Sequence, residues 1–283
     1  MRLHALVALL PALGAQGIRI IQSNDDGWAE QYIRSFHNDL IAAGHDVVLS
    51  APAGNKSGSG SLDIDPSPRR NACQYDSCPA GSGPIGRNET SPQLNWVNSY
   101  PATSMRNLYL VVHVSGTVGA AVHAAKNAKI PAIAFSGASV GALSWDRPEE
   151  QRSRVYAELA TALTNAVVAG GKPYLPEDVF LNLNFPKVDG RCTDPSQFEW
   201  VLTRINEGIL SAPDTEHCGS TRLPHESSVV GAEGCYIAVS VGDANDKSTA
   251  SAEKQAVVRD KLASLWTCFP SSRRMKKRHN NKL

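Results

Sequence analysis

Short runs of β-branched residues alternate along the chain with apolar residues at helical spacing. Residues 18–23 form a β-branched run that predicts a buried strand. Apolar side chains then recur at helical spacing from Ile33 to Ile41, which predicts a helix, and Gly44 stands where a C-terminal cap belongs. Residues 46–51 predict a second strand. A strand, a helix and a strand within about 35 residues form the βαβ unit of a parallel sheet.

The same alternation continues along the chain and predicts an α/β domain. We expect further elements in the order strand 108–114, helix 117–127, strand 132–136, helix 149–168, strands 179–185, 199–204 and 236–241, and helix 252–266. Residues 52–104 are instead rich in Gly, Ser, Pro and Asn, so they predict a long excursion with little regular structure. A loop of this length inside a domain is usually functional.

The N-terminal segment and the cysteines favour a secreted protein. Residues 1–15 have a basic start, an apolar centre and small residues at their end, which is the layout of a signal peptide. The alternative for this segment is a buried N-terminal strand or helix. The chain contains six cysteines without a CxxC pair of the kind that binds zinc, so we expect disulfides. Spacing suggests a pairing only for Cys73 and Cys78, which lie close together.

Composition and charge exclude several classes of protein. The chain has 283 residues, of which 42% are apolar, so it can bury a substantial core. Beyond the N-terminal segment no apolar run approaches the ~18 residues that mark a membrane-spanning helix. The formal net charge is +1, but residues 270–283 carry six Lys and Arg and no acid, which leaves −5 for the rest. A mildly acidic body with a solvated basic tail disfavours a nucleic-acid-binding domain.

Two adjacent acids follow the first predicted strand. In an open parallel sheet, ligands bind beyond the carboxyl ends of the strands. Asn24, Asp25, Asp26 and Gly27 occupy this position, and Gly27 gives the turn backbone freedom. Neighbouring carboxylates repel each other unless a proton or a cation lies between them, and a hard cation such as Mg²⁺ prefers oxygen ligands. The pair therefore favours a divalent-metal site, with helix capping by one Asp as the alternative.

Two further loops are expected at the same edge of the sheet. The second predicted strand leads into a polar loop in which Ser57 offers an oxygen ligand and Asn55 can meet an anion. Taken alone, this loop is an ordinary polar one. In the third loop Ser115, Gly116 and Thr117 lead from a strand into a helix of small residues. The free N–H groups and the dipole of such a helix start favour a phosphate, although Ser and Thr also cap helices that bind nothing.

These three loops resemble the hallmarks of the SurE family of metal-dependent phosphatases and nucleotidases. The family motifs are an N-D-D-G turn, an A-P-x-x-N-x-S-G loop and an S-G-T-V-G-A-A helix start, which occur here at residues 24–27, 51–58 and 115–121. The likeness extends through residues 181–186 and 234–241, and it is strongest to secreted fungal-type members. It implies a Rossmann-like three-layer α/β/α fold with a mainly parallel sheet, at residues 16–269.

The resemblance also implies an activity and a set of site residues. The implied activity is hydrolysis of small phosphomonoesters by a 5′- or 3′-nucleotidase, or by an acid phosphatase acting on nucleoside monophosphates, with Mg²⁺ or Mn²⁺. The metal ligands that carry over are Asp25, Asp26 and Ser57, and the two acids are the expected catalytic residues. The expected phosphate-binding residues are Asn24, Asn55, Ser115, Gly116 and Thr117. The family further implies a homo-oligomer formed by exchange of C-terminal elements.

The family's fourth metal ligand does not carry over. This ligand is an Asn in an S-G-x-N-x-G-x-N motif that precedes the S-G-T helix start. Here residues 106–114 contain no Gly, and Asn107 is their only Asn. A catalytically impaired pseudoenzyme that binds a phosphate-bearing ligand is therefore the first alternative.

A serine esterase is the second alternative. Residues 137–141 read G-A-S-V-G, which matches the nucleophile elbow of serine hydrolases with Ser139 as nucleophile. Asp178 and either His217 or His225 follow in the order that such a triad needs. Pro148 argues against this alternative because it interrupts the helix that should follow the elbow directly.

Overall fold

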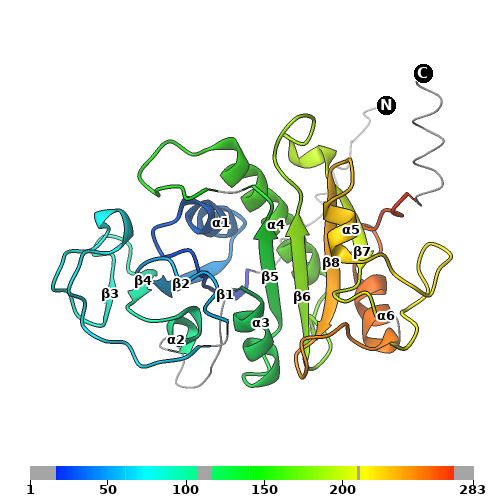
Figure 1. Cartoon of the computed structure of the whole chain (residues 1–283), viewed down its shortest axis with the longest axis horizontal. Coiled ribbons are helices and arrows are strands. Elements are labelled where there is room, and N and C mark those ends of the chain that lie inside the picture. The colour runs from blue at the N-terminus through cyan, green and yellow to red at the C-terminus, as the bar shows by residue number, and fades with distance from the viewer. Residues whose placement is uncertain (1–16, 61, 107–116, 140, 209–210, 271–283) are drawn as a thin grey trace, which may run out of the picture.

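The structure is a computed structural model that describes residues 17–60, 62–106, 117–139, 141–208 and 211–270. Helices flank both sides of the strands in a three-layer α/β/α arrangement (Figure 1). The expected signal peptide at 1–15, the expected strand at 108–114, and nearly all of the basic tail lie outside the described residues. Among the described helices, none combines the length and the apolar composition that a membrane span requires.

The first sheet carries the N-terminal βαβ unit. Its strands lie in the order β1 (Arg19–Gln22), β2 (Asp46–Pro52), β4 (Leu94–Val97) and β3 (Ile85–Arg87). The pairs β1–β2 and β2–β4 are parallel, and β3 runs antiparallel to β4. Helix α1 (Gln31–Ala42) forms the crossover from β1 to β2, as the apolar periodicity predicts. The carboxyl ends of β1 and β2 therefore point the same way and lie side by side.

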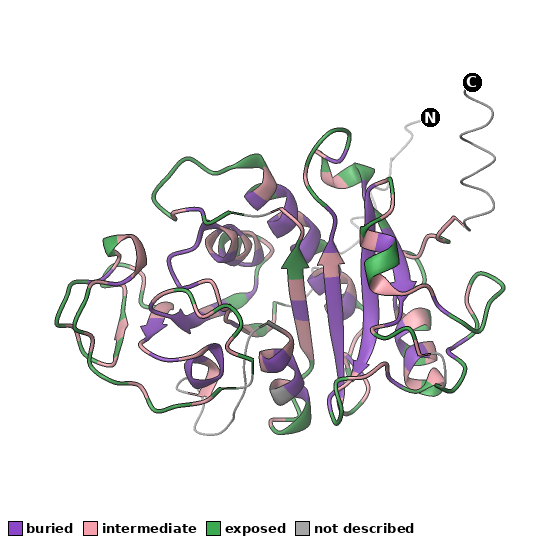
Figure 2. Ribbon diagram, in the orientation of Figure 1, coloured by how far each residue is buried: buried purple, intermediate pink, exposed green. Residues whose placement is uncertain are grey.

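The second sheet contains the most deeply buried strands. Its order is β5 (Ala132–Gly137), β6 (Val179–Phe185), β8 (Tyr236–Asp243) and β7 (Glu199–Thr203). The pairs β5–β6 and β7–β8 are parallel, whereas β6 and β8 are antiparallel. Figure 2 shows β6 and β8 buried along most of their length. Over both sheets most pairings are parallel, which confirms the expected Rossmann-like class.

Helices cover both faces of the second sheet. On one face, apolar side chains of α4 (Gln151–Ala169) and α6 (Ala252–Lys261) belong to the same buried cluster as Leu181 and Leu183 of β6. Helix α6 contacts β8, and α1 lies against α4. On the other face α3 (Thr117–Lys126) packs against Phe180, and α5 (Glu226–Val230) lies over β8. Successive β6 residues thus point to opposite helix layers. Leu181 and Leu183 face one layer, whereas buried Asn182 faces the other and donates a 2.9 Å hydrogen bond to Glu226 of α5.

The long excursion contains more regular structure than the sequence predicts. Strands β3 and β4 and helix α2 (Pro101–Arg106) lie within or across the end of residues 52–104, so the expectation of little regular structure is wrong there. Strand β4 adds to the sheet because Trp96 packs into the cluster that also holds Ala51 and Leu49 of β2. Helix α6 ends at Lys261, five residues before the expected end.

Three disulfides tie the described chain together. Cys73–Cys78 closes a five-residue loop and confirms the pairing suggested by spacing. Cys192–Cys235 and Cys218–Cys268 join segments 43 and 50 residues apart, which spacing alone does not reveal. All six cysteines are paired in this way. The first disulfide is the one that bears on the candidate site, because its loop packs against the turn after β1.

Candidate functional site

The turn after β1 is closed by its own first residue. The Asn24 side chain accepts a hydrogen bond from the Gly27 N–H and donates one to the Gly27 carbonyl, both at 3.1 Å. Asp25 and Asp26 stand between these two residues at the carboxyl end of the strand. The structure thus gives Asn24 a role in shaping the turn, while its expected contact with phosphate stays a prediction.

The loop after β2 meets this turn. The Ser57 hydroxyl and the Asn55 amide donate to the same Asp26 oxygen, at 3.2 and 3.3 Å. The Lys56 N–H donates to the Asp25 carbonyl at 2.5 Å, so the two loops are also joined through their backbones. Two motifs about 30 residues apart in sequence therefore converge at one point. The parallel pairing of β1 and β2 produces this convergence, because it brings both carboxyl ends to one edge.

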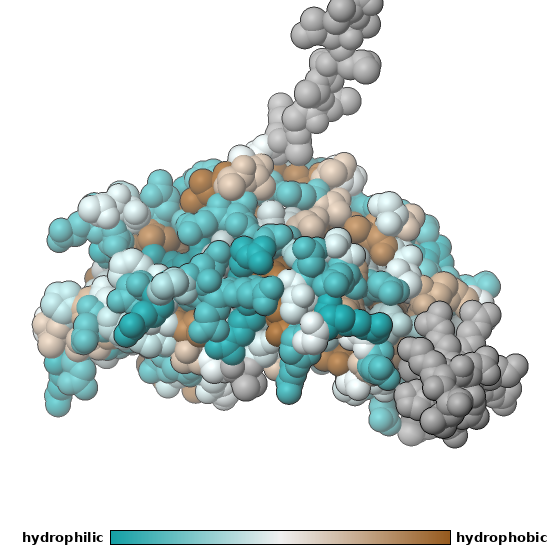
Figure 3. All heavy atoms as spheres, turned by 90° about the horizontal axis from the view of Figure 1, so that it is seen from above, coloured by the Kyte–Doolittle hydropathy of each residue, from teal (hydrophilic) through white to brown (hydrophobic). Residues whose placement is uncertain are grey.

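A cavity of about 750 Å³ opens beside these residues. Asp25, Asp26 and Ser57 line its polar end, together with Ser136 and Ser139 from the end of β5 and the segment after it. Its other walls are mostly apolar and come from β1, β5, α1, α3 and α4. Figure 3 views the molecule from the side to which the β5 and β6 arrows point, and the surface seen there is mainly hydrophilic.

The third predicted loop is described only in part. Ser115 and Gly116 lie outside the described residues, and Thr117 begins helix α3. Helix α3 packs against β5 and β6, and Ala120 and Ala121 line the same cavity as the two acids. The expected contact of Ser115, Gly116 and Thr117 with phosphate stays a prediction.

The donor set at the meeting point is suited to a hard divalent cation. Asp25 and Asp26 supply carboxylate oxygens and Ser57 supplies a hydroxyl oxygen, which are ligands that Mg²⁺ and Mn²⁺ accept. No group of three or more His, Cys, Asp or Glu side chains within the described ranges is arranged to hold a metal. Cations of this kind keep several waters and bind substrate phosphate oxygens, so two carboxylates and one hydroxyl are a fitting protein contribution.

Glu30 is a buried carboxylate close to the turn after β1 that sequence reasoning missed. Glu30 is only 2% exposed and stands at the start of α1. One of its oxygens accepts a 2.5 Å hydrogen bond from the Leu143 N–H, and the other accepts a 2.9 Å bond from the Tyr75 hydroxyl. Burial raises the pKa of Glu30, and the hydrogen bonds from Leu143 and Tyr75 oppose this rise. Glu30 therefore links the turn after β1 to two loops that are distant in sequence.

The serine esterase alternative is not supported by the surroundings of Ser139. Its hydroxyl oxygen lies 2.9 Å from the Tyr156 hydroxyl and 3.1 Å from the Val188 nitrogen. His225 instead contacts the Ile205 carbonyl, and His217 packs edge-on against Trp266. In the part of the chain that the structure describes, both histidines required as the base are thus engaged elsewhere.

Asp178, the third member of that triad, is also engaged elsewhere. Its carboxylate accepts a hydrogen bond from Lys129 at 2.6 Å. A serine hydrolase needs the acid to orient a histidine that in turn contacts the nucleophile. The geometry therefore argues against a catalytic triad of Ser139 and Asp178 with either His217 or His225.

Comparisons with known proteins give one family and several relatives. The family described as "Survival protein SurE" matches residues 20–212. An acid phosphatase of Yarrowia lipolytica is 28% identical, and the match covers 78% of this chain and 78% of that protein. A 5′-nucleotidase SurE of Lawsonia intracellularis is 27% identical over 60% of this chain and 67% of its own length. One of the same name from Xylella fastidiosa is 29% identical over 69% of this chain and 73% of its own.

Replacement of Gly27 by Ala tests the packing behind the turn. A Cβ at Gly27 would lie 2.0 Å from the Gln74 Oε1, and the φ of +120° strongly favours glycine. Gly141 has a similar φ of +107°, and a Cβ there would meet only the Arg152 guanidinium at 3.5 Å, so Gly141→Ala reports the backbone cost nearly alone. We expect Gly27→Ala to lower the free energy of unfolding by more than Gly141→Ala does, because the Gln74 side chain must move away, as measured by urea denaturation. Equal losses would contradict the packing.

A second prediction concerns the pH dependence of stability. The pKa of Glu30 lies above its ordinary value of 4.5 because of burial. Such a carboxyl stabilises the folded state fully below the unfolded pKa, and this contribution is lost as the pH rises through the folded pKa. We therefore expect Glu30→Gln to become more stable relative to the wild type between pH 4.5 and pH 7. Urea unfolding at both pH values measures the difference, which should stay constant if Glu30 titrates as it does in the unfolded chain.

Proposed function

The chain belongs to the SurE family, and from this membership and the site we propose that it is a metal-dependent phosphomonoester hydrolase. The proposed substrates are nucleoside monophosphates, so that the enzyme acts as a 5′- or 3′-nucleotidase or as an acid phosphatase. The observation that carries the proposal is the convergence of Asp25, Asp26 and Ser57 at the carboxyl ends of β1 and β2. The names of the relatives, acid phosphatase and 5′-nucleotidase, support the same class of reaction.

Asp25, Asp26 and Ser57 are the residues that would hold Mg²⁺ or Mn²⁺. When bound, such a cation polarises a phosphoryl oxygen and lowers the pKa of a bound water. The protein contributes a carboxylate of fixed orientation, because Ser57 and Asn55 both donate to one oxygen of Asp26. A side chain that is already oriented needs less rearrangement when the substrate arrives.

We further propose that the third loop holds the phosphate. Ser115, Gly116 and Thr117 precede or begin α3, a helix of ten residues. Free N–H groups at a helix start and the helix dipole both favour an anion there. Asn55, whose side chain is exposed beside Asp26, is proposed as a further phosphate contact. Asn24 is proposed to act mainly through the turn that it closes.

Secretion and self-association complete the proposal. The disulfides support an oxidising compartment, since such bonds persist mainly in secreted proteins. The layout of residues 1–15 supports removal of a signal peptide. A homo-oligomer is proposed from family membership alone. The acidic charge of the chain before its tail supports a small phosphomonoester rather than a nucleic acid as partner.

A catalytically impaired pseudoenzyme is the second candidate. The observation in its favour is that residues 106–114 contain none of the Gly-rich, Asn-bearing motif that supplies the family's fourth metal ligand. A chain without this ligand would still present the carboxylate pair, and would bind a phosphate-bearing ligand without turnover.

Release of inorganic phosphate from adenosine 5′-monophosphate in Mn²⁺ tests the proposal. We expect turnover by the full chain, loss of turnover in the presence of a chelator, and a decrease of about 100-fold or more in Asp25→Asn. A catalytic metal contributes several kcal/mol to the stabilisation of the transition state, which corresponds to a rate factor of this size.

Asp189→Asn is the matched control, because Asp189 is exposed and lies outside the cavity, and we expect it to leave the rate unchanged. Activity that survives both the chelator and Asp25→Asn would refute the site. A wild-type chain that binds Mn²⁺ but releases no phosphate would favour the pseudoenzyme.

A further inference from the structure

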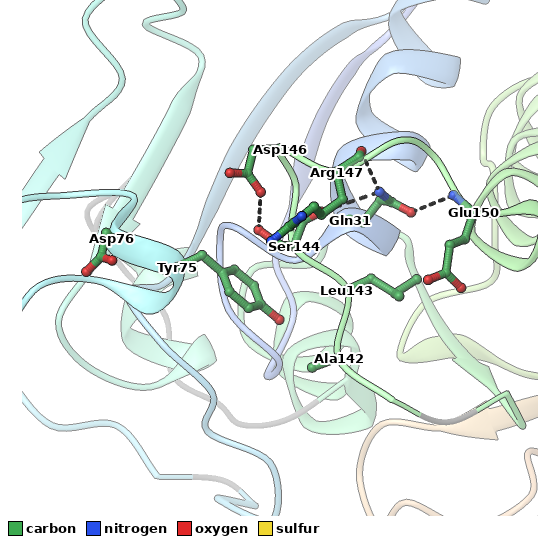
Figure 4. Close-up of a pocket in the computed structure, with 9 residues that line it drawn as sticks. All are labelled: Gln31, Tyr75, Asp76, Ala142, Leu143, Ser144, Asp146, Arg147 and Glu150. Atoms are coloured by element: carbon green, nitrogen blue, oxygen red, sulfur yellow. Dashed lines mark hydrogen bonds between the residues drawn. The ribbon is translucent and has the colours of Figure 1, made fainter.

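A second pocket opens between the disulfide loop and the segment that follows β5. It has a volume of about 480 Å³, within the range of small-molecule sites. Tyr75 and Asp76 line it from the Cys73–Cys78 loop, whereas Ser144, Asp146 and Arg147 line it from the opposite segment. Figure 4 shows the Tyr75 ring on one side and these three side chains across from it.

Gln31, at the start of α1, lines this pocket and binds the segment that follows β5. The Gln31 N–H donates to the Leu143 carbonyl at 2.8 Å, and its side-chain amide donates to the Arg147 carbonyl at 3.1 Å. Its side-chain oxygen accepts from the Glu150 N–H at 2.8 Å (Figure 4). The side chain of Gln31 is 3% exposed, so these bonds are shielded from water. The segment that presents Asp146 and Arg147 is therefore fixed to α1.

The opposite wall is strained and covalently held. Tyr75 and Asp76 have φ values of 57° and 54°, in the left-handed region that residues with a Cβ seldom adopt. The Cys73–Cys78 disulfide closes the loop around them, and the bond from the Tyr75 hydroxyl to buried Glu30 fixes the direction of the ring. Backbone strain of this kind concentrates at functional sites, where the surrounding structure maintains it.

The disulfide loop joins the pocket to the turn that carries the two acids. Gln74, next to Tyr75, packs so closely on Gly27 that a Cβ there would meet its side-chain oxygen at 2.0 Å. The Gln74 N–H donates to the Ala53 carbonyl at 3.0 Å, two residues before Asn55. Burial raises the pKa of Tyr75, and the nearby Glu30 and Asp26 carboxylates raise it further. The disulfide loop thus contacts both loops that form the candidate metal site.

The side chains of the pocket suit a flat, nitrogen-containing ring. A guanidinium and a phenol ring both stack on planar aromatic groups. The Asp146 carboxylate, which accepts a 2.5 Å bond from the Ser144 hydroxyl, accepts hydrogen bonds only and so matches an amino group. Arg147 and Asp146 are exposed at the pocket rim, where a ligand can reach them.

We propose that this pocket binds the organic group of the substrate, a planar heterocycle with an amino substituent, against Tyr75 and Arg147. The proposal rests on the phosphomonoester hydrolase activity described above and makes Tyr75, Asp146 and Arg147 determinants of specificity. An ester whose alcohol is small and aliphatic would reach the metal site without using the pocket.

The test compares two esters in the full chain. Arg147→Ala should lower kcat/KM for adenosine 5′-monophosphate about 10-fold, the size expected for loss of one stacking partner, and change that for glycerol phosphate by less than about twofold. Tyr75→Phe keeps the stacking face but loses the bond to Glu30 that orients the ring, so it should weaken the preference for the adenosine ester less than Arg147→Ala does. Arg154→Ala is the control, because Arg154 pairs with Glu158 on the exposed face of α4, and should change neither value.

Calorimetric binding of adenosine, which carries no phosphate, separates this proposal from the proposed activity. We expect the wild type to bind adenosine and Arg147→Ala to bind it about 10-fold more weakly. Equal losses on both esters, or unchanged adenosine binding in Arg147→Ala, would overturn the pocket assignment. Absence of turnover on every ester, with Arg147-dependent adenosine binding retained, would refute the hydrolase proposal and leave the pocket as a heterocycle site.

Discussion

The meeting of Asp26 with Ser57 and Asn55 is the interaction around which the candidate site is built. Two carboxylates on consecutive residues are unfavourable unless donors or a cation compensate them. Ser57 and Asn55 donate to one oxygen of Asp26, and they reach it because β1 and β2 are parallel neighbours whose carboxyl ends coincide. The Trp28 N–H, just past the turn, also donates to the Pro52 carbonyl at 2.8 Å. The fold thus brings Asp25, Asp26 and Ser57 to one edge, where the proposed cation would bind.

Buried Glu30 extends this arrangement to a wider region. It accepts hydrogen bonds from Tyr75 and Leu143, which lie 45 and 113 residues farther along the chain. Loss of either partner would destabilise the folded state, because a buried acceptor without a hydrogen-bond donor is costly. The turn with the acids, the disulfide loop and the segment after β5 are consequently held together, and the second pocket forms where the last two face each other.

The features that could be predicted from the sequence are those that short stretches of neighbouring residues determine. The α1 periodicity, the strand runs and the three motifs each depend on neighbouring residues, so β1, α1, β2 and the meeting of Asp26 with Ser57 could be expected. Strand β4 was missed because its four residues lie in a Pro- and Gly-rich stretch and are stabilised by packing of Trp96 on β2. No local pattern marks Glu30, since its side-chain partners Gln74, Tyr75 and Leu143 all come from loops that are remote in sequence. Spacing likewise suggested the short disulfide, and could not pair cysteines 43 or 50 residues apart.

Calorimetric titration of Mn²⁺ into the full chain tests the central claim most directly, because its readout is binding rather than turnover. If the adjacent acids hold a divalent cation, the wild type takes up Mn²⁺ at a single strong site per chain, and Asp26→Asn loses this site while remaining folded by circular dichroism. A wild type that binds no Mn²⁺, or an Asp26→Asn chain that binds it equally well, would contradict the account.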